Sequence, residues 1–142
     1  MKFEFSAGGI VYKKTGKGLE ILVAQHSQHH GWVFPKGLIG DYKENETKKE
    51  TAIREVKEET GVLGKILQPL TPITYWYVFE GQKIKKTVYY FLMEYISGDI
   101  KDHDWEMENV EWLLIDKVEK RLTYPSDKQV WKEAKQRIVN SV

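Results

Sequence analysis

The chain of 142 residues contains no cysteine. Disulfide bonds, thiol catalysis and zinc sites that need thiolates are therefore excluded. No run of roughly 18 apolar residues occurs, and the N-terminal residues contain no apolar stretch of the kind found in secretion signals. We therefore expect neither a membrane span nor a signal peptide, and a soluble cytoplasmic protein is the default expectation.

The chain also lacks an excess of charge of either sign. It has 22 lysines and arginines against 21 aspartates and glutamates, which leaves a net charge of +1. This balance gives no support for binding to bulk nucleic acid or to a membrane surface, so any basic site must be local. The length suits a single domain over residues 1–142, as a monomer or a small homo-oligomer, and no linker or repeat interrupts it.

The most informative stretch is GDYKENETKKETAIREVKEETGV, from Gly40 to Val62. Thr47 and Glu50 have the spacing of a capping box that opens a helix, and Gly61 has the place of a left-handed C-terminal cap. At about 100° per residue, three glutamates of this helix share one sector and an apolar group occupies the next. The glutamates are Glu55, Glu58 and Glu59, and the apolar group is Ala52, Ile53 and Val56.

The shared face of the three glutamates needs an explanation. Like charges at these spacings each cost an isolated helix roughly 0.2–0.5 kcal/mol, so a bound cation explains the clustering better than helix stability does. Hard divalent ions prefer oxygen ligands, which favours Mg²⁺, with Mn²⁺ as a substitute. The alternative is a solvated acidic face whose charges are balanced by Lys48, Lys49 and Lys57.

The same stretch resembles the signature of the Nudix hydrolases. That signature is a glycine, five residues, a glutamate and seven residues, followed by Arg-Glu-aliphatic-any-Glu-Glu-any-Gly-aliphatic. The matching residues are Gly40, Glu46, Arg54, Glu55, Val56, Glu58, Glu59, Gly61 and Val62. The resemblance implies an α/β/α sandwich and a Mg²⁺-dependent hydrolase, with Glu55, Glu58 and Glu59 as metal ligands and Arg54 holding a glutamate in place. The mixture of predicted strands and helices also favours an α/β fold with a mixed β-sheet flanked by helices.

One glycine of the signature is displaced. The relatives that this chain most resembles place that glycine in a Phe-Pro-Lys-Gly phrase, which here ends at Gly37, three residues before Gly40. Either Gly40 takes over the role, or the loop after Gly37 carries a three-residue insertion. Glu46 lies about 80° around the helix from Arg54, which leaves open a supporting salt link or an outer metal contact.

The residue that activates the attacking water is not defined by the signature alone. In the family this base is either a signature glutamate or a glutamate from a later loop. Here Glu106 is the leading later candidate, and Glu108 is its neighbouring competitor.

Sequences that flank the signature resemble the diadenosine tetraphosphate hydrolase branch. They are Ser6-Ala7-Gly8-Gly9, His29-His30-Gly31-Trp32, Phe34-Pro35-Lys36-Gly37 and the segment from Lys86 to Leu92. The candidate substrate-binding residues are Lys36, His30, Tyr75, Tyr77, Lys86 and Tyr89. Lysines and a protonated histidine suit phosphates, and one of the tyrosines would stack a base. The alternatives are strand core for the tyrosines and a solvated hairpin for the lysines.

The main functional prediction is a pyrophosphohydrolase of dinucleoside polyphosphates, cleaving diadenosine tetraphosphate asymmetrically to ATP and AMP. One alternative is a MutT-like hydrolase of oxidised nucleoside triphosphates, and another removes pyrophosphate from RNA 5′ ends. A third is a Nudix-like module that senses a nucleotide without cleaving it. The three intact signature glutamates argue against the last.

The remaining segments predict a series of strands and a final helix. The predicted strands are Phe3–Tyr12, Leu19–Gln25, Ile73–Phe79, Lys86–Tyr95 and Val110–Ile115. The third and fourth are expected to form a hairpin around Glu80-Gly81-Gln82. Gly8-Gly9 predicts a bulge or a close backbone approach. Ser126 and Gln129 have the spacing of a capping box for the last helix.

Overall fold

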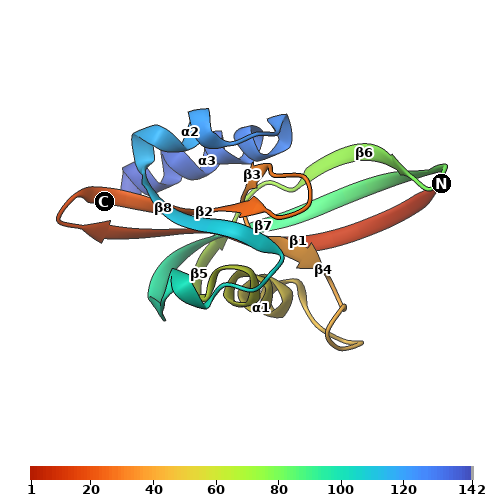
Figure 1. Cartoon of the computed structure of the whole chain (residues 1–142), viewed down its shortest axis with the longest axis horizontal. Helices are drawn as coiled ribbons and strands as arrows, with labels where there is room; N and C mark the ends of the chain where they lie inside the picture. The colour runs from red at the N-terminus through yellow and green to blue at the C-terminus, as the bar shows by residue number, and fades with distance from the viewer. Residues whose placement is uncertain (142) are drawn as a thin grey trace.

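A long mixed β-sheet separates two helical layers in the computed structural model, which describes residues 1–141 (Figure 1). The strands are β1 Lys2–Thr15, β2 Gly18–His26, β3 Trp32–Val33, β4 Lys36–Leu38, β5 Val62–Pro69, β6 Ile73–Phe79, β7 Gln82–Gly98 and β8 Met107–Leu114. The helices are α1 Lys48–Thr60, α2 Val118–Arg121 and α3 Pro125–Ser141, with short 3₁₀ turns at Ile100–Asp102 and Ile115–Lys117. This arrangement confirms the predicted α/β fold.

Pairing of β1 with β7 forms the middle of the sheet. These strands run parallel from Lys2 opposite Ile84 to Tyr12 opposite Glu94, whereas the other strand pairs are antiparallel. The strand order is β3-β2-β1-β7-β5, with β4 beside β1, β6 beside β7 and β8 beside β2. Sequence alone predicted the β6–β7 hairpin, and the structure confirms it.

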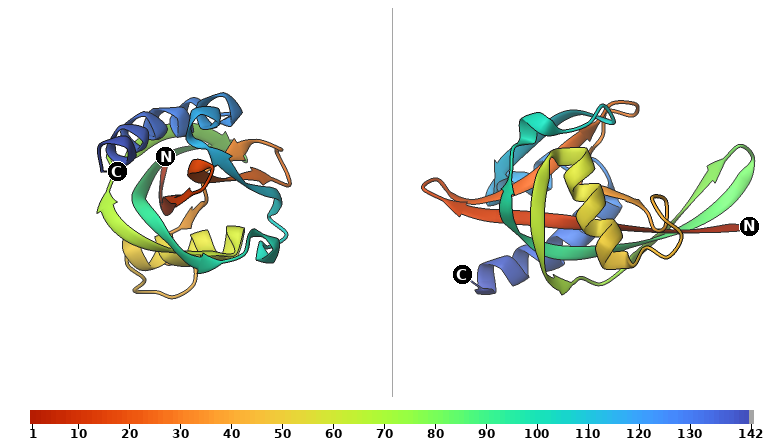
Figure 2. Two further views of the ribbon diagram at one scale, coloured as in Figure 1. Left: turned by 90° about the vertical axis from the view of Figure 1, so that its left-hand side faces the viewer. Right: turned by 90° about the horizontal axis from the view of Figure 1, so that it is seen from below.

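Each central strand contributes side chains to two hydrophobic cores. Successive side chains of a strand point to opposite faces, so Ile10 packs in the core that includes α3, and Val11 packs in the core beneath α1. Leu92 and Met93 divide in the same way on β7. The sheet therefore holds α1 on one face and α2 and α3 on the other (Figures 1 and 2).

Helix α1 has the predicted ends. Thr47 and Glu50 form the reciprocal capping box, and Gly61 closes the helix with a φ of 81°. Ala52 and Val56 are fully buried against the sheet. The amphipathic pattern thus fixes which face of α1 meets the core and which residues stand beside it.

The glycines of β1 permit a close backbone approach. A Cβ at Gly8 would lie 2.2 Å from the carbonyl oxygen of Pro35, and a Cβ at Gly9 would lie 2.7 Å from Met93 Sδ. No bulge interrupts β1 at these residues in its pairing with β7. Of the two predicted explanations, the structure shows the close approach, which brings the chain before β4 against β1.

Several features differ from the prediction, among them the unpredicted α2 and the start of β8 at Met107 instead of Val110. Strand β5 was not anticipated, because Gly64 looks like a strand breaker; the glycine is needed there, since its Cβ would meet Met93 Sδ at 2.9 Å. Strands β1 and β7 both extend beyond the predicted bounds. The Ser126–Gln129 capping box is wrong: α3 begins at Pro125, a residue suited to the first helical position, so Ser126 lies inside the helix.

Within residues 1–141 no helix is both long and apolar enough to cross a membrane.

Candidate active site

Arg54 links three carboxylates of the predicted signature. Its Nε lies 2.7 Å from Glu46 Oε2 and its Nη2 lies 2.9 Å from Glu46 Oε1, which makes a bidentate pair. Its Nη1 donates to Glu55 at 3.2 Å and to Glu58 at 3.1 Å. The hydrogen bonds from Arg54 lower the pKa of Glu46 to about 2. Of the two alternatives for Glu46, the structure therefore shows the supporting salt link.

Two of the predicted ligand carboxylates are buried. Glu55 is 8% exposed and Glu59 is 4% exposed, whereas the Glu58 side chain is half exposed. Burial raises the pKa of Glu55 to about 7, and the neighbouring Glu58 and Glu106 add to this effect while Arg54 opposes it. Burial also raises the pKa of Glu59 well above its ordinary value, and the charge of Glu55 adds to that shift. Negative charge is therefore concentrated where water is scarce.

Gly37 is the glycine that leaves room for these carboxylates. A Cβ at Gly37 would lie 1.3 Å from Glu55 Oε2, so no side chain fits there without moving the carboxylate. A Cβ at Gly40 would meet nothing closer than 3.8 Å, although this residue has a φ of 83°. The close approach thus belongs to the Phe-Pro-Lys-Gly phrase, and the additional residues form the loop that follows it.

The loop before β8 brings Glu106 to the same cluster. The Asp104 N–H donates to the carbonyl oxygen of Glu58 at 3.1 Å, which ties this loop to the end of α1. The N–H and the hydroxyl of Ser27 both donate to the Glu106 carbonyl oxygen at 2.9 Å. The side chain of Glu106 lines a pocket with Glu59, whereas Glu108 contacts His30 instead. Only the first of the two candidate bases therefore faces the cluster.

The donor set fits a hard divalent cation. Carboxylate oxygens are the ligands that Mg²⁺ and Mn²⁺ prefer, and the raised pKa values of Glu55 and Glu59 mark negative charge without enough compensation. Within residues 1–141 no three acidic or histidine side chains already converge on one ion position, and Arg54 holds Glu55 and Glu58. The residues that would hold an ion are thus neighbours, but they are not arranged as a coordination shell.

A large cleft opens beside this cluster. Its volume is about 930 Å³, and a smaller pocket of about 210 Å³ adjoins it. Both are lined by His26, His29, Val33, Lys36 and Lys86. The smaller pocket reaches Glu59 and Glu106, and the large cleft is lined by Tyr75, Tyr77, Tyr90 and Tyr124. Two lysines therefore stand between the carboxylates and an aromatic cleft.

Lys36 and Lys86 are close enough for the charge of Lys36 to affect the pKa of Lys86. Burial and, to a smaller extent, the charge of Lys36 together lower the pKa of Lys86 to about 8. The Lys36 backbone N–H donates to Glu59 Oε1 at 3.3 Å, which fixes the start of β4 against α1. Two cations beside a buried carboxylate make a site suited to a polyphosphate.

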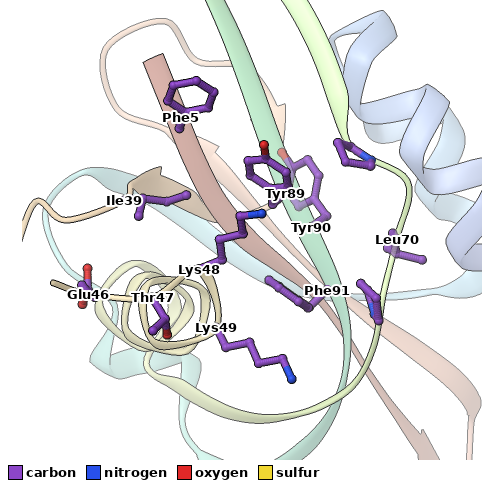
Figure 3. A pocket seen from close by; sticks show the side chains of 12 residues that line it. Phe5, Ile39, Glu46, Thr47, Lys48, Lys49, Leu70, Tyr89, Tyr90 and Phe91 are labelled. Atoms are coloured by element: carbon purple, nitrogen blue, oxygen red, sulfur yellow. The ribbon is translucent and has the colours of Figure 1, made fainter. Parts of the chain in front are cut away.

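Tyr89 does not join the other two predicted tyrosines. Side chains alternate along β7, so Tyr89 and Lys86 point to opposite faces. Tyr89 lines a separate pocket of about 1100 Å³ near the start of α1, where Lys48 Nζ lies 3.9 Å from its ring centroid (Figure 3). The structure brings Tyr75 and Tyr77 to the cleft, with ring centroids 6.3 Å apart.

The structure places His29, rather than the predicted His30, in the cleft. His29 Nδ1 accepts from the Gly31 N–H at 3.0 Å and lies 2.7 Å from the Tyr124 hydroxyl. These contacts leave the ring proton on Nε2, and burial lowers the pKa of His29, so the ring is neutral near pH 7. The side chain of His30 is 65% exposed and contacts Glu108.

Two further cleft residues have no local signal in the sequence. Tyr124 immediately precedes α3 and Asp127 lies in its first turn, about a hundred residues after His29, and only the fold brings them together. Asp127 is 4% exposed and accepts from the Phe34 N–H at 3.2 Å. It supplies a buried carboxyl in the lining of the aromatic cleft.

The NUDIX domain family matches residues 2–134. The chain belongs to this family. The NUDIX domain is 40% identical over 99 residues to a Mycobacterium tuberculosis protein that carries the mutator name MutT4, covering 70% of this chain and 39% of that protein. It is 29% identical over 123 residues to the 8-oxo-(d)GTP phosphatase of Mycolicibacterium smegmatis, covering 87% of this chain and 36% of that protein. This chain thus spans about two fifths of the length of these two relatives.

Other similar proteins are named for other activities. The NUDIX domain is 33% identical over 114 residues to the asymmetrical bis(5′-nucleosyl)-tetraphosphatase of Rattus norvegicus, covering 75% of this chain and 72% of that protein. A C. elegans Ap4A hydrolase structure aligns with a TM-score of 0.69 at 24% identity, over 96% of this chain and 98% of that one. The NUDIX domain of Shewanella oneidensis NrtR aligns with a TM-score of 0.76 at 20% identity, over 97% and 90%. These structures show the fold alone.

Substitution of Gly37 tests the origin of the close approach. We expect Gly37→Ala to weaken Mn²⁺ binding by about tenfold or more, because the new methyl group displaces the Glu55 carboxylate. The free energy of unfolding should change by no more than about 1 kcal/mol, since a flexible side chain can move. Titration calorimetry and urea unfolding measure the two effects. Gly40→Asn is the control, because asparagine tolerates a positive φ; the assignment fails if only this control weakens binding.

Proposed function

We propose that this NUDIX domain hydrolyses a pyrophosphate bond in an oxidised purine nucleoside triphosphate such as 8-oxo-dGTP, releasing the nucleoside monophosphate and pyrophosphate. The observation that carries the proposal is the continuous path from the α1 carboxylates, past two lysines, into an aromatic cleft. A nucleoside triphosphate matches this order, because its charged phosphates suit the lysines and its flat base suits the aromatic cleft.

The proposed substrate occupies both the large cleft and the smaller pocket. Its phosphates lie in the smaller pocket, where Lys36 and Lys86 balance their charge, and its base lies in the large cleft beside Tyr75 and Tyr77. A divalent ion held by Glu55, Glu58 and Glu59 would neutralise phosphate charge and activate water. The Nε2–H of His29 is available to donate to a phosphate oxygen.

The proposed reaction is attack of water at phosphorus. The water oxygen forms a bond to phosphorus, the bond to the leaving pyrophosphate oxygen breaks, and the water proton passes to the Glu106 carboxylate. Burial raises the pKa of Glu106, with the charge of Asp104 as a second cause, which makes it a stronger base than an exposed carboxylate. Arg54 and Glu46 hold the neighbouring α1 carboxylates in place.

Relatives and cleft shape favour a triphosphate over the dinucleoside polyphosphate predicted from sequence. Two of the compared relatives are named as a mutator protein and as an 8-oxo-(d)GTP phosphatase. Tyr75, Tyr77 and Tyr124 line one cleft, which suits a single base, and the Asp127 carboxyl offers a partner for its polar edge. Diadenosine tetraphosphate is the second candidate, because the rat tetraphosphatase matches over most of its own length.

A substrate panel tests the proposal directly. The panel contains 8-oxo-dGTP, dGTP, diadenosine tetraphosphate, ADP-ribose and 5′-triphosphorylated RNA, each with Mg²⁺, and products are separated by anion exchange. We expect 8-oxo-dGTP to have the highest kcat/KM, with pyrophosphate as a product. If diadenosine tetraphosphate is hydrolysed to ATP and AMP with a higher kcat/KM than 8-oxo-dGTP, it becomes the first candidate substrate. Tight nucleotide binding without any product would instead support the sensing module.

The two candidate bases form a matched pair of variants. Glu106→Gln is expected to lower kcat by about 10²–10⁴, because the side chain facing Glu59 can no longer accept the proton. Glu108→Gln should keep kcat within about twofold, since Glu108 contacts His30 outside the pocket. Mn²⁺ affinity is measured for both variants to separate proton transfer from metal binding. Equal kcat values would remove Glu106 from the mechanism.

The pH dependence of kcat/KM tests Lys86. Because its pKa lies at about 8, Lys86 carries its charge below that pH and loses it above, so kcat/KM should fall as the pH rises through about 8. Lys86→Arg keeps the charge throughout and should remove this fall, whereas Lys86→Met should lower kcat/KM below about pH 8, where Lys86 is charged, and have little effect well above it. The neighbouring Lys83→Arg is the control and should leave the profile unchanged. A persistent fall in Lys86→Arg would assign the titration elsewhere.

A further inference from the structure

A three-stranded arm projects from the body of the domain. The N-terminal part of β1, the first half of β7 and most of β6 extend beyond the helices (Figures 1 and 2), whereas Ile73 at the start of β6 packs in the core with α3. Strand β6 forms one edge of this arm, because it pairs with β7 on one side only within residues 1–141. Its outer edge is therefore available to another strand.

The tight turn at the end of the arm shows which backbone groups face outward. Glu80 and Gly81 have φ angles of 51° and 75°, as in a type I′ turn, so Phe79 and Gln82 are the closing hydrogen-bonded pair. Hydrogen-bonded and non-hydrogen-bonded pairs alternate along an antiparallel ladder. The backbone groups that point away from β7 are consequently those of Thr74, Trp76 and Val78.

A side-chain contact supports this assignment. Thr74 Oγ1 lies 3.2 Å from Thr87 Oγ1 on the opposite strand. Such close side chains are characteristic of a non-hydrogen-bonded pair, in which the facing Cα atoms are nearest. Thr74 therefore directs its own N–H and C=O outward, together with every second residue after it.

The β6 edge has none of the features that keep edge strands apart. Its sequence, ITYWYVF, contains no charged residue and no proline, and its pairing with β7 has no bulge. Three of its large side chains are exposed, Trp76 by 48%, Val78 by 68% and Phe79 by 59%. A long, apolar and unprotected edge of this kind is a surface for strand pairing.

We propose that β6 pairs antiparallel with β6 of a second copy of this chain, about a two-fold axis at Trp76. In this register Trp76 faces its own counterpart and Thr74 faces Val78 of the second copy. All outward backbone groups of the three residues are then satisfied, which gives about six hydrogen bonds across the axis. The same edge serves both copies, as a closed dimer requires.

The apolar composition of β6 favours a second copy over a charged strand. The β6 edge offers no charge that would select an acidic or a basic partner, and another β6 brings none. The lysines of the arm, Lys83 and Lys85, lie on β7 with their Nζ atoms 4.8 and 5.4 Å from the Trp76 ring centroid. These ammonium groups lie on the same face as Trp76 and would flank the two-fold axis, so their mutual repulsion opposes pairing and is reduced by salt. Contact between the exposed Trp76 and Val78 side chains favours pairing.

The proposed dimer also extends the cleft. Tyr75 and Tyr77 point to the face opposite Trp76 and line the cleft. With the axis at Trp76, Tyr75 of one copy faces Tyr77 of the other, so the second copy adds an aromatic ring beside the cleft wall. The dimer does not depend on which reaction the cleft supports.

Sedimentation velocity of the 142-residue chain over a range of concentrations tests the dimer. We expect a species of twice the 16.7 kDa chain mass. Val78→Pro removes an outward N–H without removing a bond to β7, so it should weaken dimerisation by about tenfold or more. The matched control Val78→Thr keeps the N–H and the β-branched shape and should dimerise like the unchanged chain.

Two results would overturn the proposal. One is a single monomeric species at about 100 μM unchanged chain, well above the range of specific dimers. The other is an unchanged dimerisation constant in Val78→Pro, which would place the interface elsewhere. Far-UV circular dichroism establishes that both variants fold, and Trp76→Lys provides a second disruption by placing two like charges at the axis.

Discussion

Burial of negative charge on α1 is the constraint around which the site is built. Removing carboxylates from water is costly unless cations or hydrogen bonds compensate. Glu46 and Arg54 form a buried bidentate pair, and the remaining N–H groups of Arg54 reach Glu55 and Glu58. Glu59 has the backbone N–H of Lys36 instead. The compensation is partial, which is why the pKa values of Glu55 and Glu59 remain raised and why the cluster suits an added cation.

The sheet determines where these carboxylates meet the cleft, although α1 and α3 lie on opposite faces. Strand β1 pairs with β4 over Ser6–Gly8 and with β2 from Tyr12 onward, so its two neighbours separate between these segments. The smaller pocket is lined by residues from these neighbouring strands and the loops after them, and it reaches Glu59 from α1. Glycine at position 8 allows the chain before β4 to lie against β1, which places Lys36 at this opening.

Sequence alone was sufficient for the features that depend on neighbouring residues. The capping box at Thr47, the cap at Gly61 and the buried face of α1 all follow from local spacing, and the structure has them as predicted. The β6–β7 hairpin also follows from two strands around a short turn. The salt link of Glu46 with Arg54 remained open, and the predicted placement of Glu46 about 80° around the helix is wrong, because Glu46 precedes the N-cap Thr47 and lies outside α1.

Features that depend on distant segments were beyond the sequence. Alternation along β7 separates Tyr89 from Lys86, but the face that meets the cleft is set by α3, which lies far along the chain. The choice of His29 over His30 depends on the Tyr124 hydroxyl, which is 95 residues away. A single local pattern carries no information about such partners.

The three-residue displacement in the signature shows how a motif can keep its chemistry when its spacing changes. Gly37 keeps its place because β4 is paired with β1 and the neighbouring Glu55 carboxylate leaves no space for a side chain. Glu46 keeps its place because Arg54 holds both of its oxygens. The chain between these two fixed points is a loop in which the Gly40 backbone hydrogen-bonds to Glu46 and the Glu46 N–H donates to the Lys43 carbonyl oxygen at 3.2 Å. Additional residues lengthen this loop at little cost. In this chain the spacing from Arg54 to Glu59 is fixed by the helix, whereas the spacing from Gly37 to Glu46 is set by a loop whose length can vary.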